Sequence, residues 1–333
     1  MAAKDILVNF IKENIFVIIA GILIITLGLT IEVAFIPKQV SKIAVRFPKI
    51  KKLDANFFST FNHYDTLPFI LTTLAVAWLA ITIFDYATQT IFSKIKPRLY
   101  THIKSTITKA IIEQKQRNYD TGEAISRTNR VIEDMTTMAI DGGREMFPGL
   151  MALIVTNTYI YTQNIKMGIV MTLGITITFL IIGAKSQKLV GISITESQNY
   201  HERSEKLNDI VHNHEHIQLN NTAQNKLEES VKDDKNYGNV LKNVIVESRN
   251  TRFITGLMSV IVLFISGWLI YREVQVGKYS KEKVGALIIV LLLYVEWTNQ
   301  LGHFLPDLLV LFGKVKDSDK FLEQILGSIN KTK

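Results

Sequence analysis

The chain has 333 residues, of which 47% are hydrophobic and 20% charged, and its mean hydropathy is +0.19. Ordinary soluble domains are seldom so apolar, and the composition predicts an integral membrane protein. The absence of cysteine excludes disulfides and thiol chemistry, and the formal charge of +8 suits anionic lipid or an acidic partner, whereas the even spread of Lys and Arg argues against nucleic acid.

The first fourteen residues predict an amphipathic elbow. A helix through residues 1–14 would place its large apolar side chains on one face: Ile6, Leu7, Phe10 and Ile11. Such a helix would lie in the membrane interface ahead of the first span. A frayed terminus is the alternative interpretation.

Six apolar runs come near the length of a bilayer-spanning helix, which needs ~20 mostly apolar residues. The predicted spans are residues 15–36, 68–92, 146–161, 167–184, 253–271 and 284–305. The third run is the least apolar because Thr156, Asn157 and Thr158 lie inside it, and a tight turn near Gln163-Asn164 leads to the fourth. Together residues 15–326 are predicted to form one membrane domain, with 327–333 as a tail.

Two long polar intervals separate these spans. Residues 93–145 and 185–252 are rich in helix formers, and a helix rises ~1.5 Å per residue, so each interval can hold two extensions that project tens of ångströms from the bilayer. The sequence thus predicts an all-α membrane protein with two long hairpins on one side. Most of the Lys and Arg lie on the side that carries these hairpins and both termini, which predicts cytoplasmic termini.

The loop at residues 38–67 is also basic, especially over residues 38–52. It is interpreted as a solvated outer loop, with binding of anionic headgroups as the alternative.

Polar side chains at helical spacing lie within two of the spans. In the sixth span, intervals of four, three and four residues put four of them on one helical face: Glu296, Gln300, His303 and Asp307. The second span has a shorter polar face of Thr82, Asp85 and Gln89. Ionisable groups at bilayer depth are costly and usually face water or a bundle interior, which favours a substrate pathway. Hydrogen bonding between packed helices is the alternative.

Four histidines fall close together in the second interval: His201, His212, His214 and His216. His212 and His216 are four residues apart on a helix and could share a metal ion, but the run does not match the HExxH pattern. We interpret the segment as a solvated hairpin tip without a metal.

Three local motifs accompany this topology. The run Gly122-Glu123-Ala124-Ile125-Ser126-Arg127 lies in the first long interval, with Asp134 following at helical spacing. After the fifth span, Gly277-Lys278-Tyr279-Ser280 leads to Gly285, and the last helix ends in Lys-Phe-Leu-Glu-Gln-Ile-Leu at residues 320–326. With these motifs, six spans and two long hairpins, the chain resembles the membrane domain of an ATP-binding-cassette (ABC) exporter over nearly its whole length.

The resemblance implies the type 1 exporter membrane fold, in which two copies, or this chain and a paralogue, form a twelve-helix pore. It also puts the sixth span on the substrate pathway. A separate nucleotide-binding subunit, which would carry ATP and Mg²⁺, is expected to dock on the elbows of the two hairpins. The resemblance assigns these docking residues: Tyr119, Asp120, Gly122, Glu123, Ser126, Arg127, Asp209, His212 and Asn221.

The sequence lacks the Gly-x-x-x-x-Gly-Lys-Ser/Thr loop that cradles nucleotide phosphates. The motif needs a glycine five residues before a Gly-Lys pair. For the pairs that begin at Gly277 and Gly313, these positions are occupied by Arg272 and Leu308. The chain is therefore predicted not to be an ATPase by itself and to carry no cofactor. The leading hypothesis is an exporter-type membrane subunit. The alternatives are a motorless scaffold protein of a larger organellar, bacterial or viral membrane assembly, an excised fragment of a longer exporter, and a passive channel.

Overall fold

The structure, a computed structural model, describes residues 2–46, 67–113 and 121–330, and every regular element in these ranges is helical. The helices are α1 (Ala2–Glu13), α2 (Ile15–Thr30), the π-helical segment η1 (Ile31–Phe35), α3 (Ile36–Arg46), α4 (Leu67–Glu113), α5 (Thr121–Gln163), α6 (Ile165–His212), α7 (His214–Leu219), α8 (Ala223–Gln275) and α9 (Lys281–Asn330). The predicted all-α fold is confirmed.

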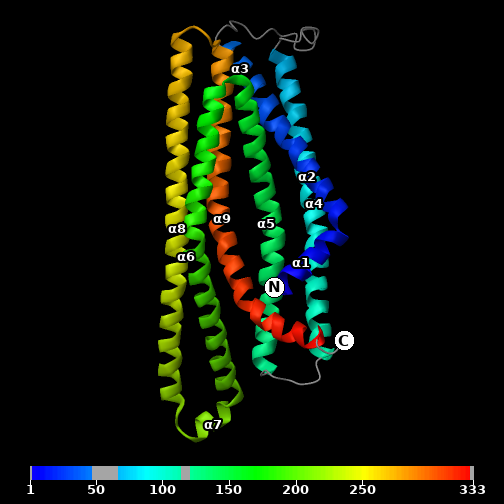
Figure 1. The fold of residues 1–333 in the computed structure, drawn as a ribbon, viewed down its shortest axis with the longest axis vertical. Helices are drawn as coiled ribbons and strands as arrows, with labels where there is room; N and C mark the ends of the chain where they lie inside the picture. The colour runs from blue at the N-terminus through cyan, green and yellow to red at the C-terminus, as the bar shows by residue number, and fades with distance from the viewer. Residues whose placement is uncertain (1, 47–66, 114–120, 331–333) are drawn as a thin grey trace.

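Five of these helices are exceptionally long. Helices α4, α5, α6, α8 and α9 contain 47, 43, 48, 53 and 50 residues. At ~1.5 Å per residue each exceeds about 60 Å, roughly twice the thickness of a ~30 Å hydrocarbon core. They run along the long axis of the molecule (Figure 1). Each helix is therefore longer than a span of the bilayer requires.

Five stretches of the described chain are long and apolar enough to cross a membrane: Ile15–Ile43, Phe69–Glu113, Ile165–His212, Ala223–Gln275 and Lys281–Glu323. The predicted third span lies in α5, which is not one of them. One of its polar side chains is bonded to the next helix, since the Asn157 side-chain N–H donates to the Thr172 hydroxyl of α6 at 2.9 Å. Helix α5 nevertheless runs along the long axis of the bundle and packs against α6 and α9 (Figure 1).

Two helical hairpins point toward one end of the molecule. Helices α6 and α8 pack along each other and are connected by α7 at the tip, and α4 and α5 run toward the same end (Figure 1). At the opposite end Asn164 separates α5 from α6, as the predicted turn requires. Its side-chain oxygen accepts from the Met167 N–H at 3.2 Å and caps α6.

Helix α1 packs on protein through its apolar face. Ala3, Ile6 and Phe10 are buried in a cluster that includes Ile103 of α4. The Ala3 N–H donates to the Asp319 carboxylate of α9 at 3.0 Å. The sequence predicts an amphipathic elbow here, and in the structure part of its apolar face packs on α4 and α9.

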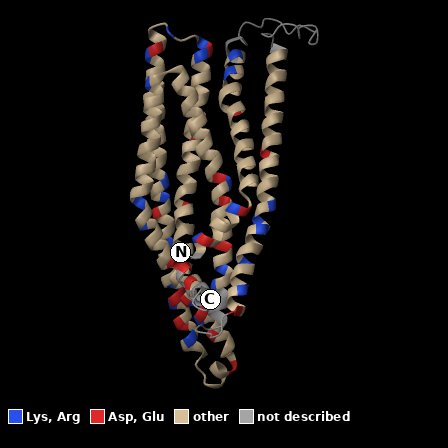
Figure 2. Ribbon diagram, turned by 45° about the vertical axis from the view of Figure 1, so that its right-hand side comes forward, with Lys and Arg blue, Asp and Glu red and all other residues tan. Residues whose placement is uncertain are grey.

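The charged residues are unevenly distributed along the length of the bundle (Figure 2). Figure 2 shows Lys, Arg, Asp and Glu concentrated at one end and in the opposite half of the bundle, with few charges between them. The apolar core of this middle region includes Met171, Leu291 and Tyr294, and the Tyr294 hydroxyl donates to the Met171 carbonyl at 3.1 Å. This pattern is typical of a multi-pass membrane protein.

Candidate functional site

A cavity of about 410 Å³ lies between α2, η1, α4, α5 and α9. Its polar lining residues are Glu32, Asp85, Thr88, Gln89, Arg144, Glu145, Glu296 and Gln300. Aliphatic and aromatic side chains form the rest of the wall, among them Phe84, Phe92 and Trp297. An apolar wall with a few convergent polar groups is the usual composition of a small-molecule site.

The cavity has a strong excess of negative charge. Four carboxylates, those of Glu32, Asp85, Glu145 and Glu296, share it with the single guanidinium of Arg144. Within the described ranges, no Lys or Arg forms an ion pair with any of the four. Asp85 does accept a hydrogen bond from the Gln89 amide at 2.8 Å.

The π-helical segment η1 carries the charge that the first span contributes. Glu32 is the one charged residue in the predicted span 15–36, and it lines the cavity while the neighbouring Val33 is buried in the bundle core. Short π-helical turns inside α-helices are frequent at functional sites. The backbone irregularity and the intramembrane carboxylate therefore coincide.

The predicted polar face of the sixth span separates into two groups. Glu296 and Gln300 line the cavity, whereas Asp307 forms an ion pair with Arg252 and accepts from the Ser248 hydroxyl at 3.2 Å, both on α8. Four residues on one face of a long helix meet different neighbours along its length. Helix α9 also bends (Figure 1).

Two further predicted pathway residues lie outside the cavity lining. His303 is exposed on the surface of the single chain. Thr82 is exposed too, and its hydroxyl donates to the Trp78 carbonyl of its own helix at 2.9 Å. The predicted faces of the second and sixth spans thus meet through Asp85, Gln89, Glu296 and Gln300.

A second polar site lies at the junction of the hairpins with α9. Its centre is Glu196 of α6, which is 1% exposed. The Glu196 carboxylate accepts from the Tyr237 hydroxyl of α8 at 2.8 Å, and pairs with Lys314 of α9 at 3.0 Å and with Arg130 of α5 at 3.5 Å. One carboxylate therefore connects three other long helices.

Further side chains extend this junction. The Arg130 guanidinium lies 3.6 Å from the centroid of the Tyr200 ring, and its Nε is 3.6 Å from Asp134. His201 Nε2 lies 3.9 Å from the Asp317 carboxylate. The junction contains three basic side chains and three acidic ones. The basic residues are Arg127, Arg130 and Lys314, and the acidic residues are Asp134, Glu196 and Asp317.

The protonation of the junction follows from its burial. Desolvation, followed by the nearby Arg127 charge, lowers the pKa of His201 to about 4, so its imidazole is neutral near pH 7. Burial and the hydrogen bond to Glu196 raise the pKa of Tyr237 to about 12, so this phenol keeps the proton that it donates. Burial likewise raises the pKa of Asp134.

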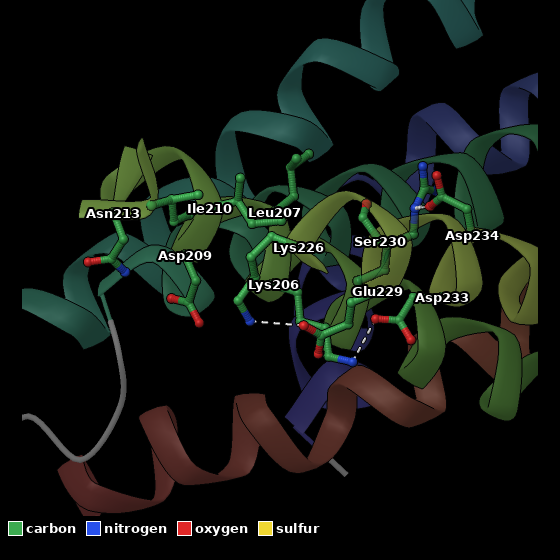
Figure 3. Close-up of a pocket in the computed structure, with 12 residues that line it drawn as sticks. Lys206, Leu207, Asp209, Ile210, Asn213, Lys226, Glu229, Ser230, Asp233 and Asp234 are labelled. Carbon is green, nitrogen blue, oxygen red and sulfur yellow. Dashed lines mark hydrogen bonds and ion pairs between the residues drawn. The ribbon is translucent and has the colours of Figure 1, made fainter. Parts of the chain in front are cut away.

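The tip of the α6–α8 hairpin has a pocket of about 290 Å³ (Figure 3). Ion pairs surround it, including Lys206–Asp233 at 2.6 Å and Lys226–Glu229 at 2.9 Å. Its apolar lining comes from Leu207, Ile210 and Ile217. The tip thus offers an apolar depression with a charged rim at the end of a projecting hairpin.

The predicted docking residues of the second hairpin lie at this tip. Asp209 lines the pocket, His212 ends α6, and Asn221 follows α7 with a φ of 53°, in the left-handed region that Asn tolerates. In the described ranges no three His, Asp or Glu residues converge as metal ligands. His216 contacts the Asn220 amide of its own tip.

The predicted docking residues of the first hairpin lie at the start of α5 or just before it. Tyr119 and Asp120 lie outside the described residues. Gly122, Glu123 and Ser126 lie in the first turns of α5. Arg127 packs toward α9, with its guanidinium 5.9 Å from the centroid of the Phe321 ring.

Comparison with known families identifies the fold. Residues 43–296 match the ABC transporter transmembrane region. The chain belongs to this family. The match runs from the end of α3 to Glu296 in α9 and covers most of the chain. No curated protein matches the chain significantly.

Sequence reasoning missed several residues of this ABC transporter membrane region. Glu32, Arg144 and Glu145 complete the cavity. Glu32 had a signal, since it is the lone charge in its span. Glu196 and Lys314 had none, because a carboxylate and an ammonium in polar helical extensions are usually solvated, and only the packing of α6 on α9 buries them.

Proposed function

We propose that this chain is the membrane subunit of an ABC exporter, that it works as a dimer, and that a separate ATPase subunit drives it. The observation that carries the proposal is the charged cavity at bilayer depth. Unpaired carboxylates such as Asp85 and Glu296 are costly inside a membrane unless they face water or a protein partner.

The substrate pathway is assigned to the cavity. Glu296 and Gln300 of α9 face Asp85 and Gln89 of α4 across it, and Glu32 adds a carboxylate from the first span. Thr82 and His303 lie on the exposed surface of the single chain, where a second copy or water would contact them. In this proposal Asp307 serves instead to connect α9 to α8 through Arg252.

Dimerisation follows from the exposure of these groups. Asp85, Glu296 and Gln300 are exposed in the single chain. A charge presented to lipid near the middle of a bilayer costs ~2.5–3.5 kcal/mol on insertion scales. A second copy, or a paralogue, that covers the α4–α9 face would remove this cost and enclose the pathway between two bundles.

The ATPase subunit is proposed to dock on the ends of both hairpins. The tip pocket, about 290 Å³ in volume, supplies an apolar depression and a rim of charged residues, and the start of α5 would complete the contact. ATP and Mg²⁺ would bind to that subunit. The hairpins and both termini would then lie in the cytoplasm.

Cysteine accessibility tests the pathway directly, because the chain has no native cysteine. Gln300→Cys should react with a small hydrophilic thiol reagent in the folded, nanodisc-embedded protein. Thr298→Cys is the matched control, since Thr298 lies on the same helix and is 2% exposed. Protection of both positions would indicate a dry, packed seam and would favour a motorless scaffold.

Co-purification tests the motor. Under mild detergent the chain should bring down a nucleotide-binding subunit, and only the complex should show vanadate-sensitive ATP hydrolysis. The chain alone should remain at background. Stoichiometric recovery of an abundant coat or assembly protein in place of an ATPase would contradict the exporter proposal.

A further inference from the structure

We infer that the transmembrane cavity selects organic cations with an apolar body. This inference rests on the proposed transport function and names the class of substrate that the pathway takes. It combines the charge of the cavity, the nature of its walls and an unsatisfied donor beside it.

The charge of the cavity favours a cation. Glu32, Asp85, Glu145 and Glu296 line it against Arg144 alone, and no Lys or Arg of the described chain forms an ion pair with any of the four carboxylates. Coulomb attraction is far stronger in an apolar surrounding than in water. A cationic ligand would supply the positive charge that these side chains lack, and an anion would meet repulsion on several sides.

The walls favour an organic ligand over an inorganic ion. Phe84, Phe92 and Trp297 contribute aromatic surface, and the volume of about 410 Å³ is in the range of sites for small organic molecules. Aromatic faces attract cations, with tryptophan the strongest. An apolar cation would therefore gain contacts from the same walls that make a hydrated metal ion unfavourable.

The donor beside the cavity is independent of the carboxylates. The indole N–H of Trp297 is buried and finds no hydrogen-bond acceptor within the described residues. A buried donor without a partner costs free energy. Because Trp297 lines the cavity, a ligand that carries an acceptor next to its apolar body would satisfy this group.

The test compares two probes of the same shape and opposite charge, tetraphenylphosphonium and tetraphenylborate. Trp78 and Trp268 are 54% and 52% exposed and are replaced by Phe, so Trp297 becomes the only tryptophan. Tetraphenylphosphonium should produce a saturable change in Trp297 emission in nanodiscs. Tetraphenylborate should produce none beyond its partition into lipid.

Matched variants separate cavity binding from partition, since all share the same lipid. The double variant Glu32→Gln/Glu296→Gln should weaken tetraphenylphosphonium binding by about tenfold or more. Glu296→Asp, which keeps the charge, should weaken tetraphenylphosphonium binding much less than the double variant does. Asp307→Asn lies on the same helix outside the cavity and should leave the affinity unchanged. Melting temperature and elution volume establish that each variant is folded.

The inference is overturned if tetraphenylborate binds as well as tetraphenylphosphonium, if tetraphenylphosphonium gives no saturable response, or if the double variant binds with parental affinity. Accessibility of the Gln300→Cys variant in the same preparation distinguishes the two levels of the argument. A reactive thiol at that position without cation binding removes only the substrate class, whereas a protected thiol removes the pathway itself.

Discussion

At the scale of single residues, the Glu196 carboxylate is the centre of a buried polar junction. It is 1% exposed, and its partners Arg130, Tyr237 and Lys314 come from three other helices. A buried ion pair adds little net stability, because desolvation offsets the attraction, but the loss of one partner leaves the others uncompensated. The junction is thus sensitive to the removal of its central carboxylate.

Glu196→Ala should lower the free energy of unfolding by about 3–5 kcal/mol, because the partly buried Arg130 and Lys314 lose their shared, fully buried partner. Denaturation in mixed micelles measures this change. Glu202→Ala, six residues along α6 at an exposed position, is the matched control and should change stability little. Equal effects of the two substitutions would mean that the Glu196 contacts do not support the fold.

His201 makes the stability of the junction depend on pH. Its pKa in the folded chain is about 4, below the ordinary 6.5, because burial and the Arg127 charge disfavour the imidazolium. Arg130, Glu196 and Asp317 also face it. Between these values the unfolded chain binds more protons than the folded chain, so stability falls with decreasing pH.

The contribution of His201 should be fully present above pH 6.5 and should be lost as the pH falls toward 4. Melting curves from pH 7.5 to 4.5 should therefore decline more steeply for the parent protein than for His201→Gln. His212→Gln, at the exposed tip, should decline as the parent does. Parallel curves for parent and His201→Gln would refute this reading of the site.

At the scale of elements, the junction requires close packing of α6 against α9. Gly313 makes this possible, because a Cβ at that position would lie 2.7 Å from the Ser193 Cβ and 2.9 Å from the Val190 carbonyl oxygen. Gly313 immediately precedes Lys314 in α9, and Ser193 lies three residues before Glu196 in α6. A small residue in α9 therefore sets the distance across which the ion pair forms.

Gly313→Ala should destabilise the protein by about 1–3 kcal/mol, since both nearby atoms belong to backbone or to a side-chain stem that cannot move aside easily. Gly267→Ala is the control, because nothing lies within 4 Å of a Cβ there, and alanine favours helix by roughly 0.5–1 kcal/mol over glycine. The two variants should shift the melting temperature in opposite directions. A stabilising Gly313→Ala would show that α6 and α9 do not approach as described.

At the scale of the whole molecule, both hairpins extend from the same end of the bundle (Figure 1). Helix α1 is hydrogen-bonded to α9 in the half of the molecule that carries the hairpins. The opposite end carries the α5–α6 turn at Asn164 and the start of α9 at Lys281. The charge distribution favours the hairpin end as cytoplasmic.

Single cysteines test this orientation in intact cells. Lys281→Cys should react with a membrane-impermeant reagent added outside, and Asn221→Cys should react only after permeabilisation. Both positions are exposed, unlike Ser41, which is 2% exposed and unsuitable as a reporter. The reverse pattern of labelling would place the hairpins outside.

Much of this architecture follows from the sequence because its determinants are local. The length of an apolar run decides whether a helix can span the membrane, and the lengths of residues 93–145 and 185–252 predict two projecting hairpins. The turn at Asn164 follows from polar residues between two apolar runs. These features need no knowledge of which helix packs on which.

The sites depend on neighbours that the sequence does not specify. Helical periodicity places Glu296 and Asp307 on one face, but the packing of α9 directs one into the cavity and the other to Arg252 of α8. Periodicity also predicts the apolar face of α1 without saying that α4 and α9 cover it.

Sequence therefore determined the class of the protein, its long helices and the polar residues of its second and sixth spans. Tertiary structure alone decided that Glu32 joins Asp85 and Glu296 in one cavity, and that Glu196 meets Lys314. The physical reason is that burial and charge pairing arise from helices far apart in the chain, whereas hydropathy and helical period are read within a few turns.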